Sequence, residues 1–203
     1  MDGAAPPARI VTPRLVVRSY TRADAPLVKD AVDSSIDHLR AFMDWAWELP
    51  EPLAAIESRL ELFHEQFERG ETFVYGIFTP DEAELVGGAG LHRRVGPDAF
   101  EIGYWIRATR LRQGLVTEAT AALTRAAFDC CRVGRVEIHI DPANEPSLGV
   151  PARLGYVREA TLRRRLPPVR QGGPRRDEVV FSLLAEEYPG SPCAAVRVDG
   201  LDG

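Results

Sequence analysis

The sequence predicts an α/β (α+β) domain in which helices flank both faces of a mixed, mostly antiparallel sheet of about seven strands. Three observations lead to this fold class. Apolar segments between residues 72 and 107 follow one another through short turns, which is typical of an antiparallel meander. After residue 114, helical and strand periodicities alternate, which is typical of βαβ crossovers. The length of 203 residues, with 45% hydrophobic and 27% charged side chains, suits one globular domain.

The N-terminal part is expected to hold a strand followed by helical segments. Residues 10–20 carry apolar side chains at alternate positions, which predicts a strand. Thr21 is a good helix N-cap and Asp24 follows three residues later, so a helix is expected to begin there. Residues 52–69 repeat apolar side chains every three or four positions and are followed by Gly70, which predicts an amphipathic helix with a glycine stop.

The remaining elements follow from the same two periodicities and from the turns between them. Apolar runs and period-two alternation predict strands at 72–78, 85–94, 100–107, 135–141, 156–162 and 177–184. Helical periodicity predicts helices at 115–131 and 144–154. A loop rich in arginine, proline and glycine separates the last two strands.

Composition restricts the functional classes. The net charge of −5 argues against general nucleic-acid binding. No apolar run is long enough for a transmembrane helix, and the N-terminus lacks the features of a secretory signal. The cysteines Cys130, Cys131 and Cys193 do not make a disulfide framework. These observations predict a cytoplasmic protein without membrane or nucleic-acid partners.

Residues 102–127 combine a strand, a turn with one glycine and an amphipathic helix, which together suit phosphate binding. The first N–H groups of a helix have no internal partner, and the helix dipole places partial positive charge there. Gly114 allows the backbone to approach a ligand, and Arg107, Arg110 and Arg112 add formal charge. Many such units bind nothing, so this pattern needs support from the rest of the chain.

Motifs along most of the chain supply that support. They are TPRLVVR (12–18), SSIDHLRAFMDWA (34–46), EIGYWI (101–106), GLVTEA (114–119), DPANEPS (141–147) and RLGY (153–156). With these motifs in this order, the chain resembles the GNAT (Gcn5-related) N-acetyltransferase superfamily and, within it, the RimJ/RimL-like group. The likeness covers residues 10–188, which we take as one domain. Residues 1–9 and 189–203 are expected to be flexible tails.

The resemblance implies acetyl-CoA as the donor, a primary amine as the acceptor and no metal. In the family the fourth strand splays from the fifth, and the pantetheine arm of the cofactor lies between them. Here these strands correspond to 100–107 and 135–141. The resemblance places the cofactor against Ile106, Arg107, Arg112, Gln113, Gly114, Leu115, Val116, Thr117, Asn144 and Ser147.

The chain departs from the family pattern at three positions. The family's pyrophosphate loop reads Gln/Arg-x-x-Gly-x-Gly/Ala, and this chain keeps Gly114 but has Leu111 and Val116 at the two ends. Because backbone N–H groups do most of the holding, cofactor binding can survive these side-chain changes, and the sequence leaves open whether they weaken it. Pro151 lies inside the predicted helix at 144–154, where proline removes a hydrogen bond and distorts the turn.

Amine acetylation needs a base for the amine proton and an acid for the leaving thiolate. The resemblance suggests Glu101 as the base, while the residues alone leave open a solvent-facing glutamate there and a base at His92 or His139. The resemblance also suggests Ser147 as the acid, with Asn144 contacting the cofactor arm. Both residues would equally well cap a helix, and the two roles are compatible.

The acceptor side is less well defined by the sequence. The resemblance suggests Phe42, Trp45 and Tyr104 as acceptor-binding residues, and the alternative for each is packing between helices or in the core. The arginine-rich loop at 163–176 is either a solvated surface or a device that steers an acidic partner toward the acceptor entrance.

Together these features predict an acetyl-CoA-dependent N-acetyltransferase that acts on a protein N-terminus or a small-molecule amine. Direct transfer in a ternary complex is expected, because no cysteine lies near the motifs of the cleft. The alternatives are a degenerate acyl-CoA-binding sensor or interaction module without turnover, and an enzyme with a longer acyl donor. The sequence leaves open whether the chain forms a homodimer.

Overall fold

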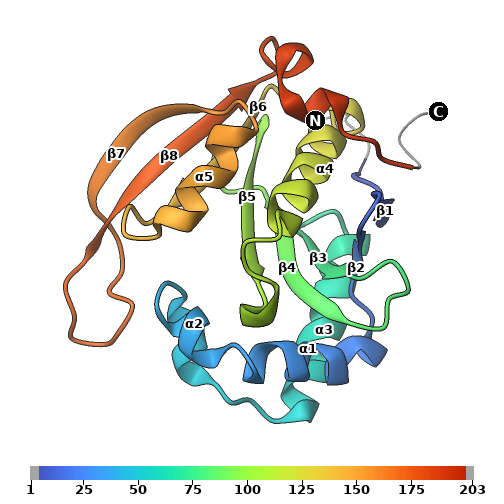
Figure 1. The fold of residues 1–203 in the computed structure, drawn as a ribbon, viewed down its shortest axis with the longest axis vertical. Helices are drawn as coiled ribbons and strands as arrows, with labels where there is room; N and C mark the ends of the chain where they lie inside the picture. Colours follow the sequence, from blue (N-terminus) through green and yellow to red (C-terminus); the bar gives the residue numbers. More distant parts are fainter. Residues whose placement is uncertain (1–4, 200–203) are drawn as a thin grey trace.

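One mixed sheet runs through the molecule (Figure 1). The computed structural model describes residues 5–199, and within them eight strands lie in the order β1-β2-β3-β4-β5-β6-β8-β7. They are β1 (Arg9–Val11), β2 (Val16–Ser19), β3 (Phe73–Phe78), β4 (Leu85–His92), β5 (Ala99–Ile106), β6 (Arg135–Ile140), β7 (Val157–Leu166) and β8 (Arg176–Leu184). Neighbouring strands are antiparallel except β5 and β6, which are parallel. The predicted fold class is therefore confirmed.

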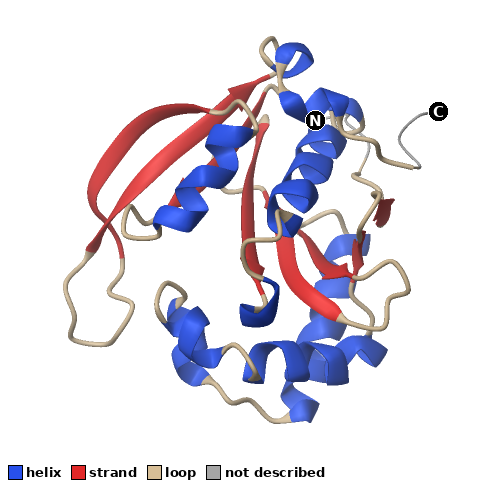
Figure 2. Ribbon diagram, viewed as in Figure 1, coloured by secondary structure: helices blue, strands red, loops and turns tan. Residues whose placement is uncertain are grey.

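Helices cover both faces of this sheet (Figure 2). Across the described part of the chain the α-helices are α1 (Ala25–Asp33), α2 (Ile36–Arg40), α3 (Leu53–Glu68), α4 (Leu115–Asp129) and α5 (Glu145–Arg153). Strand side chains alternate between the two faces. On β5, Ile102 packs in the core that contains α4, whereas Trp105 packs against the core beneath α1 and α3.

The first predicted strand is in fact a hairpin, and this raises the strand number above the expected seven. Residues 10–20 split into β1 and β2 around a turn at 12–15, where Pro13 lacks the N–H that a continuous ladder requires. The Thr12 N–H donates to the Leu15 carbonyl at 2.9 Å, and the Leu15 N–H donates to Thr12 Oγ1 at 3.1 Å. The strands expected as fourth and fifth are therefore β5 and β6.

The two central strands separate soon after they meet. In β5 and β6, residues 99–101 pair with residues 135–137, and no pairing between the two strands continues beyond that point. The rest of β5 pairs only with β4, while β6 pairs with β8 on its other side. The predicted splay between these strands is therefore confirmed, and one edge of β5 is left without a strand partner.

The segment after β8 packs against the domain over residues 188–199. Cys193 and Val198 are fully buried in the core that contains α4, and Asp199 forms a β-bridge with Val11. A flexible tail was expected at 189–203, whereas residues 189–199 pack against the domain. The polar composition of this segment gives no sign that two of its side chains are buried. Residues 1–4 and 200–203 of the expected tails lie outside the described residues.

Candidate functional site

A cleft of about 870 Å³ lies where β5 and β6 separate. It is lined by side chains from four segments: α2 and the residues after it, the end of β5, the loop into α4, and α5. They are His38, Leu39, Phe42, Met43, Tyr104, Trp105, Ile106, Arg110, Leu111, Arg112, Gln113, Gly114, Leu115, Val116, Thr117, Asn144, Pro146, Ser147, Val150 and Arg153. No aspartate or glutamate is among these described lining residues. The cleft is therefore apolar with several cationic groups.

The start of α4 forms one end of the cleft. Gly114 is its N-cap residue and has a φ of 75°, which favours glycine, and Arg112 before it also has a positive φ of 58°. Arg14, from the turn between β1 and β2, donates to the Gln113 carbonyl at 2.9 Å and pairs with Glu118 at 2.6 Å. The tight turn into a fifteen-residue helix is therefore fixed from outside, and its free N–H groups line the cleft.

The two departures from the family pattern in this loop both lie at the cleft. Val116 is half-buried and packs against the core below α4. Leu111 is 37% exposed at the mouth of the cleft. Neither side chain removes a backbone N–H from the helix start, so the anion-binding property of this end remains.

Ser147 and Tyr104 meet across the cleft from α5 and β5. The Asn144 side chain accepts the Ser147 N–H at 3.4 Å, so Asn144 caps α5 as expected. Ser147 Oγ donates to Tyr104 Oη at 3.3 Å, and the Tyr104 hydroxyl donates to the Ser147 carbonyl at 3.2 Å. Burial raises the pKa of Tyr104 to about 12, although the hydrogen bond with Ser147 lowers it, so the hydroxyl keeps its proton at neutral pH.

Glu101 lies outside the cleft lining, in a cluster of charged groups on β5, β6, β8 and the turn after β4. Both of its carboxylate oxygens bond to the Arg94 guanidinium, one of them at 2.6 Å, and His139 Nδ1 lies 4.0 Å from Oε2. His139 also contacts Glu137 at 2.5 Å and Glu178 at 3.5 Å. Burial alone would raise the pKa of Glu101, but the bond to Arg94 outweighs it and the pKa is lowered.

Three predicted site residues do not line the cleft. Besides Glu101, these are Arg107 and Trp45. Arg107 turns away to pair with Asp30 at 2.8 Å. Trp45 packs edge-to-face on Trp105, with ring centroids 6.4 Å apart, and stays 39% exposed. The structure brings the other predicted cofactor- and acceptor-binding residues, Phe42, Tyr104, Ile106, Arg112, Gln113, Gly114, Leu115, Val116, Thr117, Asn144 and Ser147, together around one cleft.

Sequence reasoning missed several lining residues. His38 and Met43 face the cleft from within the segment 34–46, and Arg153 faces it from the RLGY motif. Burial lowers the pKa of His38, so its ring is neutral at physiological pH. These residues lie within the matched motifs. The motifs do not show which of their side chains face the cleft, because that depends on how the short helix packs in the fold. His92, in contrast, is bound to Thr72 at 3.1 Å and lies outside the cleft lining.

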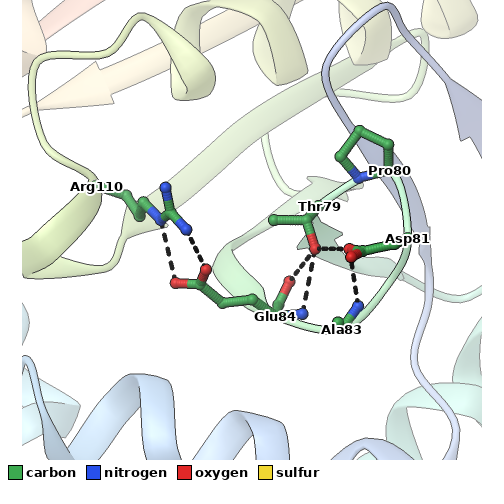
Figure 3. A pocket seen from close by; sticks show the side chains of 6 residues that line it. All are labelled: Thr79, Pro80, Asp81, Ala83, Glu84 and Arg110. Atoms are coloured by element: carbon green, nitrogen blue, oxygen red, sulfur yellow. Dashed lines mark hydrogen bonds and ion pairs between the residues drawn. The ribbon is translucent and has the colours of Figure 1, made fainter.

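A second, shallower depression of about 440 Å³ lies over the turn between β3 and β4 (Figure 3). Its polar groups bond to one another: Thr79 Oγ1 donates to Asp81 at 2.6 Å, and Arg110 is held by the Glu84 carboxylate at 3.1 Å. Arg110 lines both hollows, so its charge is already compensated where it reaches the cleft. The depression is thus a turn whose polar groups are bonded to one another. Of Arg110 and Arg112, Arg112 is the better candidate to bind an anionic ligand in the cleft.

Neither a metal centre nor a membrane span is found in the described part of the chain. No group of His, Cys, Asp and Glu side chains there could hold a metal ion. No helix there is long and apolar enough to cross a membrane.

The comparisons with known proteins agree with one another. A family model described as an acetyltransferase (GNAT) domain matches residues 14–157. The chain is 29% identical over 185 residues to the [ribosomal protein uS5]-alanine N-acetyltransferase of Escherichia coli K12, covering 90% of this chain and 94% of the relative. A crystal structure of a probable acetyltransferase superposes with a TM-score of 0.78 and 26% identity, over 87% of this chain and 96% of that one.

The fold is also shared with a more distant solved structure. Mycobacterium smegmatis RimJ in complex with CoA-disulfide superposes with a TM-score of 0.81 and 24% identity. The match covers 98% of this chain and 99% of that chain. At this identity the likeness concerns the fold, which both chains keep over almost their whole length.

Proposed function

Because the chain belongs to the GNAT acetyltransferase family, we propose that it transfers an acetyl group from acetyl-CoA to the α-amino group of a protein N-terminus. One observation carries this proposal. The cleft opens at the point where β5 loses its β6 partner, and the start of α4 lies at one end of it. A free strand edge next to a free helix N-terminus suits a ligand with amide groups at one part and phosphates at another.

The residues around the cleft fit acetyl-CoA. The N–H groups at Gly114–Thr117 would hold the pyrophosphate, with Arg112 as the nearby cation. The unpaired edge of β5 at Ile106 and its neighbours would pair with the pantetheine amides, as an added strand does. Acetyl-CoA supplies an activated thioester carbonyl and a thiolate leaving group. Arg107 is left out of this site, because it pairs with Asp30.

We assign the proton donor for the thiolate to Ser147 and the proton acceptor for the amine to Glu101. An α-amino group has a pKa of about 7.7–8.0, so part of it is already neutral at physiological pH. Glu101 then needs to take up the proton only after attack on the thioester, which an ionised carboxylate does through water. Glu101 shares its strand face with Trp105, which lines the α2 side of the cleft.

The lining of the cleft favours a protein N-terminus over a polycationic amine. Around its acceptor side lie His38, Leu39, Phe42 and Met43, and no described lining residue is a carboxylate. A polyamine or an aminoglycoside carries several ammonium groups that would be buried there without counter-charges, which is costly. A peptide that begins with a small uncharged residue has no such cost. The named activity of the E. coli relative, on the alanine of ribosomal protein uS5, has the same chemistry.

The test is thiol release from acetyl-CoA with a panel of amines. We expect release with peptides beginning in alanine or serine, and little with spermidine or an aminoglycoside. Preference for the polycations would overturn the acceptor assignment. Binding of acetyl-CoA in a thermal-shift assay without release on any amine would indicate an acyl-CoA-binding module instead. Propionyl-CoA and longer acyl-CoA donors in the same assay show whether the acyl group is acetyl.

The base is tested separately with Glu101→Gln. We expect turnover to fall by about 10²-fold or more, with acetyl-CoA affinity unchanged, because general base catalysis contributes about 10²–10⁴-fold. The parallel variants His38→Gln, His92→Gln and His139→Gln identify the base if Glu101→Gln keeps its activity.

A further inference from the structure

Helix α5 contains a proline where a helix does not normally tolerate one. Pro151 lies in the interior of α5, six residues after the first residue, Glu145. A proline there has no N–H for the carbonyl four residues earlier, and its ring collides with that carbonyl and tilts it away from the helix axis. The carbonyl affected in this way belongs to Ser147.

The Ser147 carbonyl has a partner outside the helix. The Tyr104 hydroxyl, from β5, donates to the Ser147 carbonyl at 3.2 Å. The same tyrosine oxygen accepts the Ser147 Oγ hydroxyl at 3.3 Å. The two residues are 43 positions apart in the sequence and both line the cleft. The defect in α5 therefore coincides with a reciprocal pair of hydrogen bonds at the site of proton donation.

We propose that Pro151 is a positioning residue, which frees the Ser147 carbonyl for Tyr104 and so holds the Tyr104 and Ser147 hydroxyls together as one proton-donating pair. This inference rests on the proposed acetyl transfer and adds to it a role for Tyr104 and for a proline that departs from the family pattern. Pro151 acts through Ser147 and does not itself touch the reacting atoms.

The proton balance of the step involves both hydroxyls. As the carbon–sulfur bond breaks, the sulfur takes the proton of Ser147 Oγ. Ser147 Oγ then accepts the proton of Tyr104 Oη, 3.3 Å away, once the tyrosine hydroxyl rotates from the Ser147 carbonyl toward Ser147 Oγ. Tyr104 is restored through water by the amine proton, which Glu101 takes up first and then releases. The amine has then lost one proton and the thiol has gained one, so nothing else is consumed.

The pair also suits its surroundings. The hydroxyl of Tyr104 is held at one end by the Ser147 carbonyl, so its oxygen stays within reach of Ser147 Oγ when the cleft fills. With an N–H at position 151, the carbonyl would bond along the helix axis, and the tyrosine would lose its anchor. A proline in this helix lowers its stability. In return, the Ser147 carbonyl stays available to Tyr104, and the two hydroxyls stay together.

The experiment is a double-mutant cycle on Pro151→Ala and Tyr104→Phe. We expect each single variant to lower kcat by about 10-fold, a part of the 10²–10⁴-fold that general acid catalysis contributes. KM for acetyl-CoA should change less than about two-fold, because neither change touches the helix start at Gly114. The double variant should be no slower than Tyr104→Phe alone, since both changes remove the same hydrogen-bonded pair.

Two controls separate this result from misfolding. Pro151→Ala should melt at a temperature close to that of the wild type, because the restored helical hydrogen bond offsets the loss of the buried ring atoms. Pro26→Ala changes a proline at the start of α1, where no helical bond is missing, and should leave kcat unchanged. Unaltered kcat in Pro151→Ala, or losses that multiply in full in the double variant, would overturn the inference. Absence of thiol release by the wild type itself would overturn the proposed function instead.

Discussion

The two ends of the cleft are built in different ways. At the end proposed to hold the cofactor, the loop into α4 is fixed through backbone conformation: Gly114 has a positive φ, and Arg14 holds the Gln113 carbonyl at 2.9 Å. At the end proposed to hold the acceptor, α2 is a five-residue helix, and Arg40 ties the chain after it by bonding to the Ala46 and Leu49 carbonyls. The cofactor end presents backbone groups, and the acceptor end presents side chains. Backbone groups suit a donor that is the same in every reaction, and side chains suit an acceptor that can differ from one enzyme to another.

The largest effect is expected at the cofactor end. Gly114→Ala and Gly70→Ala both place a side chain at a left-handed position, with φ of 75° and 68°. Each should lower the free energy of unfolding by about 1–2 kcal/mol. Only Gly114→Ala should weaken acetyl-CoA binding, by about 10-fold or more, because relief of the strain moves the N–H groups of α4. Calorimetric titration of both variants measures this, and equal affinities would remove the distinction between the two glycines.

A change at the acceptor end should affect the KM for the acceptor and not the binding of acetyl-CoA. Phe42→Ala removes an aromatic wall and is expected to raise KM for the acceptor peptide by about 10-fold, since burying a phenylalanine stabilises by about 1.5–3 kcal/mol. KM for acetyl-CoA should not change. Leu62→Ala, an exposed position on α3, is the control. A rise in both KM values for Phe42→Ala would mean that the two ends are not separate.

A third change tests the charge cluster behind the acceptor end. The pKa of Glu101 is lowered by Arg94 in spite of burial, so its contribution to stability is present above its usual pKa and is lost as pH falls through the lower value. Arg94→Met leaves burial unopposed and should move the acid limb of kcat/KM to higher pH by about one unit. A limb that stays in place would show that Glu101 does not control turnover.

The smallest effect is expected from the brace on the cofactor loop. Arg14→Ala removes an ion pair with Glu118 whose arginine is 51% exposed, and exposed pairs contribute only about 0.2–1 kcal/mol. KM for acetyl-CoA should rise by about two- to five-fold. Arg22→Ala, which removes exposed pairs with Glu57 and Glu61 away from the cleft, should leave KM unchanged. Equal KM values in the two variants would show that Arg14 does not support the loop.

The sequence could predict the cofactor end because its signals are local. Gly114, the helix after it and the apolar strand before it occupy consecutive positions, and periodicity finds such units. The family resemblance also predicted that Asn144 and Ser147 lie at the same cleft. The splay of the predicted fourth and fifth strands followed from the same resemblance.

The parts that sequence reasoning missed depend on contacts between distant positions. Arg107 follows the cleft strand directly, yet it turns to Asp30, and local patterns carry no information on such a partner. The hairpin of β1 and β2 has the alternation of a single strand, and although Pro13 marks the break locally, the contacts of Thr12 and Arg14 with Glu118 that hold the turn come from a distant helix. The partner of the Ser147 carbonyl likewise comes from a strand far earlier in the chain.

The short parallel pairing of β5 with β6 has a consequence for cooperativity. It joins two antiparallel units, β1–β5 and β6–β8, through residues 99–101 and 135–137 alone within the described sheet. Because three residue pairs join β5 to β6, we expect the pairing at this seam to open locally more readily than the antiparallel pairings on either side, while the core that contains α4 keeps the two units together. A ligand held by both units adds its binding free energy to the seam. Amide hydrogens of β6 should therefore exchange more slowly when acetyl-CoA is bound, and the ligand would act as a structural clamp as well as a substrate.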